Sequence, residues 1–322
     1  MKGKTSVEDN NVDLFGNKLI EPKLIDRETL TAVFKNTMRG INESDIVSML
    51  YSKFDAIIDF ARLCKGEKAG EKISMLFNPH RFSTDTTGKP SIVKGFNNDG
   101  FLSGLARVCL FMNGKKTKQL FYQSIQIGIN GYQYVNEFPP VIARDFYTLF
   151  GGQKILDPCA GWGGRMIGAA SVGAFYHGFE PSTKTYNGLL KLGEFLKLFK
   201  TGFDFKIECL PFEDADIKEK YDVALTSPPY YDTELYSAEE TNSCNRYKDY
   251  NSWCNGFYIP MIKKVLQHVE TFIINVGNRR YPLKQTLYDY FPKTQEIKSR
   301  LAGHGGLGKK EDGKESFFIV KN

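Results

Sequence analysis

The sequence predicts an α/β protein with a mostly parallel sheet, preceded by a mostly helical N-terminal lobe. After residue 150, short buried strands alternate with helices, a pattern typical of a parallel sheet covered on both faces. A glycine-rich turn follows the first of these strands, and apolar residues at helical spacing fill much of the first half. We therefore expect a helical and irregular lobe over residues 1–134 and a sheet domain over residues 135–322.

Composition limits the class of protein. The 322 residues are 41% hydrophobic and 14% aromatic, which is enough for a core and excludes disorder. The net charge of +6 permits a polyanionic partner without requiring one. No stretch approaches the roughly 20 apolar residues of a membrane helix, and the N-terminus has no apolar signal core. Six cysteines without a C-x-x-C pair are typical of reduced thiols, so we expect a cytoplasmic protein without membrane partners.

In the N-terminal lobe, apolar spacing predicts one helix over residues 43–64. Residues 77–100 are rich in Pro, Gly, Asn and Thr, which predicts a long loop of the kind that is often functional. Helical patterns return in residues 101–150.

The C-terminal half contains six strand patterns, separated by three helical ones. Helices are predicted over 165–172, 182–199 and 252–270, and strands within 155–157, 173–182, 205–211, 220–229, 271–277 and 315–322.

The glycine-rich turn lies in residues 155–165 (ILDPCAGWGGR). Glycines permit positive φ and close approach of a ligand, and such a turn in a doubly wound sheet lies at the ligand-binding edge. Glu180 ends the next strand, where it can accept both hydroxyls of a ribose. Asp157 would repel a pyrophosphate and attract a cationic, phosphate-free cofactor such as S-adenosylmethionine. A tight turn without a ligand is the alternative, and Trp162 either covers the cofactor or packs in the core.

A second motif, Ser227-Pro228-Pro229-Tyr230, ends the strand Tyr221–Thr226. Two prolines fix φ and remove backbone donors, so the turn is rigid and presents the Pro228 carbonyl as an acceptor. Methyl transfer to an exocyclic base amine needs acceptors off the ring plane that pull the nitrogen towards sp³. The Ser227 hydroxyl and the Pro228 carbonyl can be these acceptors, while Tyr230 stacks on the ring. A proline turn that only closes a strand is the alternative.

At these two motifs the sequence resembles the amino-methyltransferases of DNA. DPCAGWGG (157–164) is similar to the family's cofactor motif, and the Ser-Pro-Pro-Tyr turn is similar to its catalytic tetrapeptide. NPHRF (78–82), VNEFPPVIARDFY (135–147) and SPPYYDTELYS (227–237) resemble segments of phage-type methylases that join an N-terminal lobe to this domain. The resemblance covers most of residues 77–280. It implies a Rossmann-like methyltransferase with a seven-stranded, mostly parallel sheet, in the cytoplasm of a bacterial or phage-infected cell.

The same resemblance implies the ligands and the site. The cofactor would be S-adenosylmethionine, and the substrate would be a base flipped out of double-stranded DNA. A serine in the first tetrapeptide position slightly favours N4 of cytosine over N6 of adenine. Ser227, Pro228, Pro229 and Tyr230 would hold the base. The cofactor-binding residues would be Phe138, Pro139, Asp157, Cys159, Ala160, Gly161, Trp162, Glu180, Pro181, Phe212 and Ser227.

Target recognition would have to come from the N-terminal lobe and from the loop after the catalytic turn, because no large insertion separates the two motifs. Candidate DNA-binding residues are Arg81, Lys115, Lys116, Asp232 and Arg246, although each lysine can equally be a solvated surface charge. Residues 301–316 (LAGHGGLGKKEDGKES) form either a hairpin tip or a finger that touches DNA. The scattered histidines indicate no metal site, and the sequence does not define an oligomeric state.

Two other functions stay open. One is amine methylation of RNA or of a protein glutamine, although residues 1–150 do not resemble an RNA-binding domain. The other is a catalytically silent subunit that binds S-adenosylmethionine or nucleic acid. A silent subunit would be expected to have lost one motif, whereas both are intact.

Overall fold

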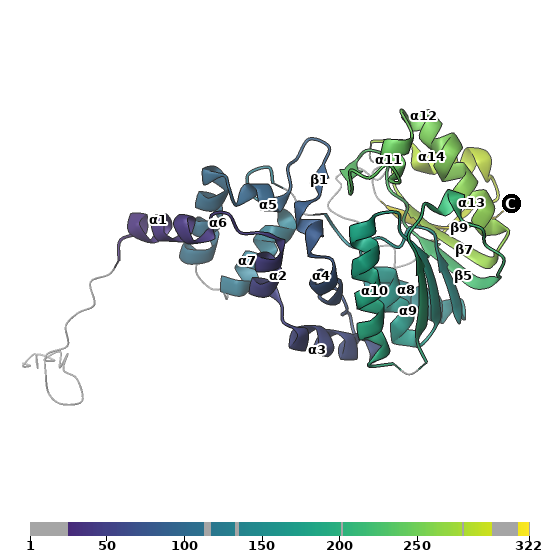
Figure 1. Cartoon of the computed structure of the whole chain (residues 1–322), viewed down its shortest axis with the longest axis horizontal. Coiled ribbons are helices and arrows are strands. Elements are labelled where there is room, and N and C mark those ends of the chain that lie inside the picture. Colours follow the sequence, from purple (N-terminus) through teal and green to yellow (C-terminus); the bar gives the residue numbers. More distant parts are fainter. Residues whose placement is uncertain are drawn as a thin grey trace, which may run out of the picture.

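The structure is a computed structural model, and it combines a helical lobe with an α/β domain (Figure 1). It describes residues 25–112, 117–132, 135–200, 202–278, 280–297 and 315–321. Lys115, Lys116 and residues 301–314 of the second glycine-rich segment lie outside the described residues, so the predictions made for them stay predictions.

A seven-stranded sheet of order β4-β3-β2-β5-β7-β9-β8 forms the α/β domain. The pairs from β4 to β7 are parallel, and β9 pairs in antiparallel fashion with both β7 and β8. The strands are β2 (Lys154–Asp157), β3 (Phe175–Phe179), β4 (Asp204–Glu208), β5 (Tyr221–Thr226), β7 (Val269–Val276), β8 (Gln295–Glu296) and β9 (Ser316–Val320). The predicted α/β class with a mostly parallel sheet is confirmed. The strand that the sequence did not indicate, β8, has two residues and is too short to show a pattern.

The strand order reverses between β2 and β5, which pair in parallel with Ile155 opposite Val223. The glycine-rich turn follows β2 and the Ser-Pro-Pro-Tyr turn follows β5. Both turns therefore leave the same edge of the sheet at its switch point, where ligands bind in doubly wound folds.

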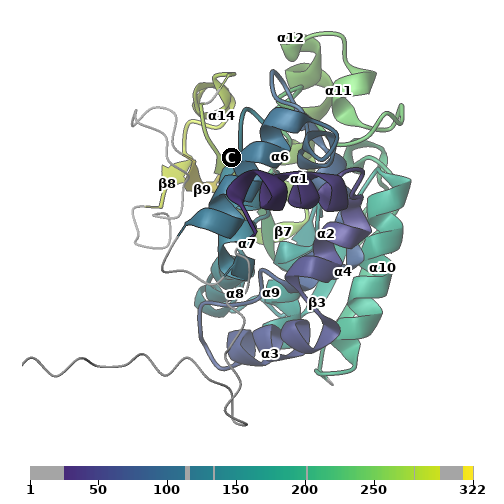
Figure 2. The same cartoon turned by 90° about the vertical axis from the view of Figure 1, so that its left-hand side faces the viewer.

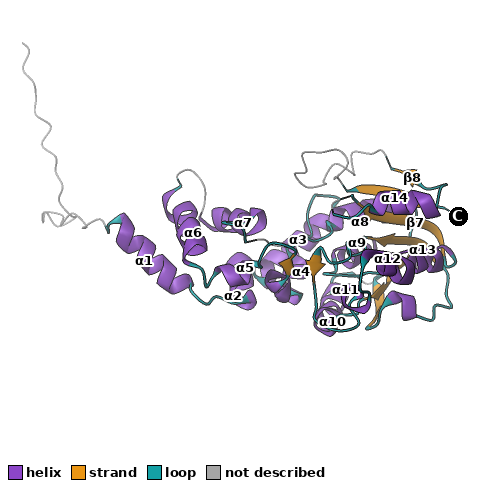
Figure 3. Ribbon diagram, turned by 90° about the horizontal axis from the view of Figure 1, so that it is seen from above, coloured by secondary structure: helices purple, strands orange, loops and turns teal. Residues whose placement is uncertain are grey.

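Helices cover both faces of the sheet (Figure 1, Figure 3). On the face towards the lobe lie α8 (Pro140–Leu149), α9 (Gly164–Val172) and α10 (Thr183–Lys197). The opposite face carries α11 (Ser243–Arg246), α12 (Tyr250–Trp253), the π-helical turn η3 (Cys254–Tyr258), α13 (Ile259–Leu266) and α14 (Leu283–Tyr290). Between the strands lie the 3₁₀ turn η2 (Phe212–Asp214) and the short strand β6 (Glu234–Leu235).

The N-terminal lobe is helical, as predicted. Its elements are α1 (Arg27–Met38), α2 (Glu43–Leu50), α3 (Lys53–Cys64), α4 (Ile73–Phe77), η1 (Pro79–Ser83), β1 (Asp85–Thr86), α5 (Ile92–Gly95), α6 (Asp99–Phe111) and α7 (Thr117–Ile127). The prediction of one helix over 43–64 is wrong. Tyr51 is extended, with φ −144°, and Ser52 caps a second helix through a reciprocal capping box with Asp55. This cap outweighs the continuous apolar spacing.

The lobe and the α/β domain share a hydrophobic core. Side chains of α3 and α4, including Phe60 and Ile73, belong to the same buried cluster as α8, α9 and α10. Both α3 and α4 lie beside this helical layer (Figure 1, Figure 2). In addition, β1 pairs with β6 in antiparallel fashion, Asp85 lying opposite Leu235. The shared cluster therefore crosses the predicted boundary between residues 134 and 135, and α2, α5, α6 and α7 have a further buried cluster within the lobe. None of the described helices is long and apolar enough to span a bilayer.

Candidate active site

The two motif-bearing turns line one cavity of about 430 Å³, a volume within the range of small-molecule sites. Glu180, which follows β3, and Tyr230, in the turn after β5, both line it. The predicted residues that line it are Phe138, Pro139, Cys159, Ala160, Gly161, Trp162, Glu180, Pro181, Phe212, Ser227, Pro228, Pro229 and Tyr230.

Glu180 closes the glycine-rich turn from the end of β3. One carboxylate oxygen accepts from the Gly161 amide at 3.1 Å and the other accepts from the Ser182 amide at 2.9 Å. Gly161 has φ +54°, a conformation that favours glycine and lets its amide point at this carboxylate. Burial raises the pKa of Glu180 to about 7. Each oxygen keeps capacity for a further donor, as a ribose diol would supply.

The two glycines that follow serve packing. A Cβ on Gly163 would lie 2.5 Å from the Leu192 side chain, and one on Gly164 would lie 2.0 Å from the Phe138 carbonyl oxygen. The turn can therefore approach α10 and the backbone before α8 only without side chains. Trp162 is buried, lines the cavity and packs edge-on against His80 at 5.2 Å, so its predicted role in covering the cofactor stays a prediction.

The structure corrects the predicted cofactor contact of Asp157. This side chain is fully buried and lies outside the cavity lining, so it does not face a ligand in the cavity. Its carboxylate accepts from Arg165 Nε at 2.7 Å and from the Tyr176 hydroxyl at 2.6 Å. The Arg165 guanidinium also donates to the Cys159 carbonyl. The charge of Asp157 is thus neutralised inside the protein, where it fixes the shape of the turn.

The Ser-Pro-Pro-Tyr turn is supported by a residue that the sequence interpretation missed. The Ser227 hydroxyl donates to Asn275 Oδ1 at 3.4 Å, and Asn275 Nδ2 donates to the Ser316 carbonyl at 3.2 Å. Asn275 ends β7, the strand next to β5, and lines the cavity. Its place at the tip of the fifth predicted strand was the available indication.

The residue after the turn, Tyr231, has φ +53°, which is strained for a bulky side chain. Its ring packs against Tyr281 at 5.5 Å and Trp253 at 6.1 Å, and its hydroxyl donates to the Tyr247 carbonyl. These contacts hold the chain in the reversal that directs Pro228 towards the cavity.

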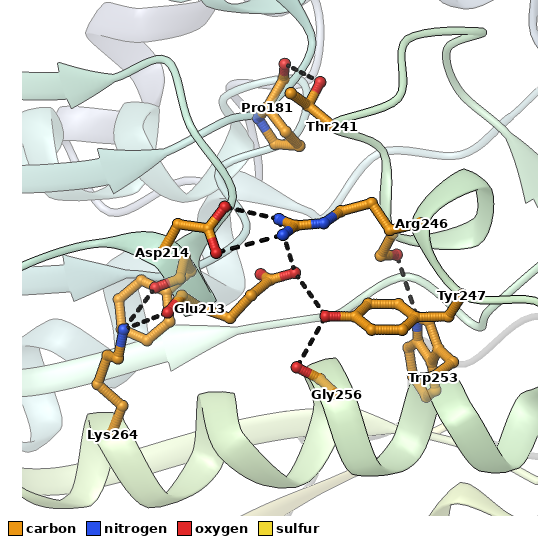
Figure 4. Close-up of polar contacts among 11 residues, drawn as sticks. Pro181, Glu213, Asp214, Thr241, Arg246, Tyr247, Trp253, Gly256 and Lys264 are labelled. Carbon is orange, nitrogen blue, oxygen red and sulfur yellow. Dashed lines mark hydrogen bonds and ion pairs between the residues drawn. The ribbon is translucent and has the colours of Figure 1, made fainter.

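A segment after the Ser-Pro-Pro-Tyr turn, residues 237–247, contributes to one side of the cavity, and Figure 4 shows its polar contacts. The Arg246 guanidinium pairs with Asp214 at 2.8 Å and with Glu213 at 3.3 Å, and the Thr241 hydroxyl donates to the Pro181 carbonyl at 3.0 Å. These contacts tie the segment to the ends of β3 and β4.

Glu213 lines the cavity next to Phe212, one of the predicted cofactor-binding residues. Its Oε1 accepts from the Tyr247 hydroxyl at 3.3 Å. Its Oε2 is buried and has no hydrogen-bond partner among the described residues. Burial raises the pKa of Glu213. A buried acceptor at a cavity wall is suited to a ligand N–H group.

The structure describes three of the candidate DNA-binding residues, and their surroundings differ. The prediction that Arg81 binds DNA is wrong. Its side chain is 1% exposed and pairs with Glu137 at 2.9 Å, so it cannot reach a phosphate on the surface. Arg246 is committed to Asp214, and a DNA contact would have to break that pair. Asp232 accepts from Arg280 at 3.0 Å and lines a shallow surface pocket with Lys89.

Charge in the cavity is predominantly negative. The lining includes the carboxylates Glu71, Glu137, Glu180, Glu213, Glu234 and Glu315, against the guanidinium groups of Arg81 and Arg165. Such a lining favours a cationic ligand or a neutral one and disfavours phosphate.

Comparisons with known proteins assign no family to the chain. No family model matches the chain, and no curated protein matches it. Among solved structures, it is similar to magnesium protoporphyrin IX methyltransferase from Synechocystis PCC 6803 with bound S-adenosylmethionine, at 14% identity over 71% of this chain and 94% of that chain, with a TM-score of 0.37. An rRNA methylase from Streptococcus thermophilus is 13% identical over 58% of this chain and 98% of that chain, with a TM-score of 0.36. At these values the likeness assigns no function; the strand order itself defines a Rossmann-like α/β protein.

Proposed function

We propose that the protein is an S-adenosylmethionine-dependent methyltransferase that acts on the exocyclic amine of a base in DNA. The observation that carries the proposal is that Glu180 and the Ser227–Tyr230 turn line one cavity at the switch point of the sheet. One turn then has the residues for the cofactor and the other has the residues for the acceptor amine.

The residues present fit the cofactor. Glu180 would accept the ribose hydroxyls, and Phe212 would pack on the adenine ring. The buried Oε2 of Glu213 would accept from the adenine amino group, which accounts for its lack of a partner among the described residues. When bound, S-adenosylmethionine supplies an electrophilic methyl group on a sulfonium, a charge that the acidic lining favours.

The base side of the cavity needs no strong base. Because Ser227 donates its proton to Asn275, the oxygen lone pairs are left to accept from the target amine. The Pro228 carbonyl supplies the second acceptor, and Tyr230, which is 7% exposed, supplies the ring surface. Both acceptors would orient the nitrogen lone pair, so positioning provides most of the acceleration.

The choice of DNA rests on the resemblance of the Ser-Pro-Pro-Tyr turn to the tetrapeptide of DNA amino-methyltransferases, with cytosine N4 slightly favoured. The exposed Lys89 lies beside the hairpin that pairs with the segment after this turn, where it could meet a backbone phosphate. Amine methylation of RNA or of protein glutamine uses the same acceptor geometry and is an outcome of the test.

The test is transfer of tritiated methyl from S-adenosylmethionine to duplex DNA, tRNA and protein, followed by mass spectrometry of the nucleosides. We expect label in duplex DNA as N4-methylcytosine. Ser227→Ala should lower the rate by about 100-fold, while Ser48→Ala, an exposed serine on α2, should not. Label confined to tRNA or protein would overturn the choice of DNA. Failure to bind S-adenosylmethionine would overturn the whole proposal.

A further inference from the structure

The glycine-rich turn lacks the negative charge that the sequence placed there. Asp157 is buried against Arg165 and is absent from the cavity lining. The methionine end of S-adenosylmethionine nevertheless carries an ammonium group, which needs an acceptor when water is excluded. Another carboxylate at this turn would have to supply it.

Glu137, just before α8, is placed for this role. Its side chain is 6% exposed and lines the cavity. Oε2 accepts from the Ser74 hydroxyl and from Arg81 Nη1 at 2.9 Å. Oε1 is buried without a hydrogen-bond partner among the described residues.

The position of this free oxygen is fixed relative to the turn. A Cβ built on Gly164, the first residue of α9, would lie 3.1 Å from Glu137 Oε1. Oε1 therefore lies at the start of α9, directly after the glycine-rich turn. The guanidinium of Arg165 lines the same wall, 4.9 Å from the centroid of the Phe138 ring. A zwitterionic amino acid would find both a carboxylate and a guanidinium here.

We propose that Glu137 binds the α-ammonium group of S-adenosylmethionine, and that Arg81 and Ser74 are positioning residues that aim its free oxygen into the cavity. The inference rests on the proposed cofactor and goes beyond it, because it assigns the support of a cofactor contact to side chains of the N-terminal lobe. The two positioning side chains come from η1 and α4, so the helical lobe completes the cofactor site.

The chemistry of the pair supports this assignment. Arg81 Nη1 and the Ser74 hydroxyl both donate to Oε2, so a rotation that exchanges the two carboxylate oxygens would break both bonds. Burial raises the pKa of Glu137. A bound ammonium group would favour the ionised carboxylate and satisfy Oε1 at once.

The experiment compares three ligands by calorimetry: S-adenosylhomocysteine, its analogue without the α-amino group, and 5′-methylthioadenosine, which lacks the amino acid. We expect the wild-type protein to bind S-adenosylhomocysteine about 10- to 100-fold more tightly than the deaminated analogue. Glu137→Gln should abolish this difference and leave the affinity for 5′-methylthioadenosine unchanged. The matched control is Glu213→Gln at the adenine end, which should weaken all three ligands by the same factor.

The outcomes separate this inference from the proposed function. Equal affinity of the wild type for S-adenosylhomocysteine and the deaminated analogue would overturn the inference without any variant. A Glu137→Gln protein that keeps the preference would also overturn it. Because that variant leaves the buried Arg81 facing a neutral amide, Arg81→Met/Glu137→Gln tests the same loss without an unpaired charge. A wild type that binds none of the three ligands would instead refute the proposed cofactor.

Discussion

Replacing Asp157 by Asn is expected to lower the free energy of unfolding, because it removes the counter-charge of a buried guanidinium. The side chains of Asp157 and Arg165 are 0% and 4% exposed, and their atoms are 2.7 Å apart. Breaking one partner of a buried pair typically costs about 3–5 kcal/mol. The lower part of this range applies here, because Arg165 keeps its bond to the Cys159 carbonyl. Weakening the Tyr176 hydrogen bond adds about 1 kcal/mol.

The expected loss of about 4 kcal/mol is a large share of the 5–15 kcal/mol typical of a folded protein. Urea unfolding followed by tryptophan fluorescence would measure it. Asp204→Asn is the matched control, because Asp204 pairs with Lys197 on the surface and its loss should cost less than about 1 kcal/mol. Asp157→Asn/Arg165→Met should recover much of the stability. If Asp157→Asn changes it by less than about 1 kcal/mol, or the double variant is no more stable, the reasoning is wrong.

Four further results are expected. The pKa of Glu180 is raised to about 7 by burial, and the ionised carboxylate is the better acceptor for ribose hydroxyls. Cofactor affinity should thus fall as the pH drops from 8 to 6, by up to about tenfold per unit below that pKa, and calorimetry of Glu180→Gln should show a flatter profile. Arg246→Ala frees the segment 237–247 and should weaken cofactor binding about three- to tenfold; an unchanged dissociation constant would contradict a role for this ion pair. Gly164→Ala places a Cβ 2.0 Å from a carbonyl oxygen and should cost about 1–3 kcal/mol in thermal unfolding. Asn275→Ala should lower kcat about tenfold in methyl transfer while leaving cofactor affinity intact; equal losses in both would indicate a structural role only.

The ends of the strands β2 and β5 could be predicted because neighbouring residues in the sequence indicate them. Buried runs ending in glycine or proline place the two turns, and the switch-point rule for parallel sheets then brings them to one edge. Glu180 followed from the same logic, since it ends the strand next to β2. The helix break at Ser52 was also readable, because Ser52-x-x-Asp55 is a capping-box pattern within the apolar run.

Pairings between distant residues were not predictable in this way. Arg81 and Glu137 are separated by 56 positions, and nothing local shows that both are buried against each other. A histidine-arginine dipeptide in a polar loop is more typical of a surface than of a core. Arg165 lies only eight residues after Asp157, yet their ion pair depends on the path of the turn between them. Burial of charge is a tertiary property, so such partners become visible only when the helices have packed.

The short pairing of β1 with β6 has a mechanical consequence. It joins residues 85–86 of the lobe to the stretch of chain that begins four residues after Tyr230, by antiparallel pairing of two residues on each strand. Because α3 and α4 also pack in the core of the sheet domain, the lobe meets that domain at two separate places. A displacement of the β1 hairpin would pass through this ladder to the segment that follows the proline turn, because the two strands share backbone hydrogen bonds.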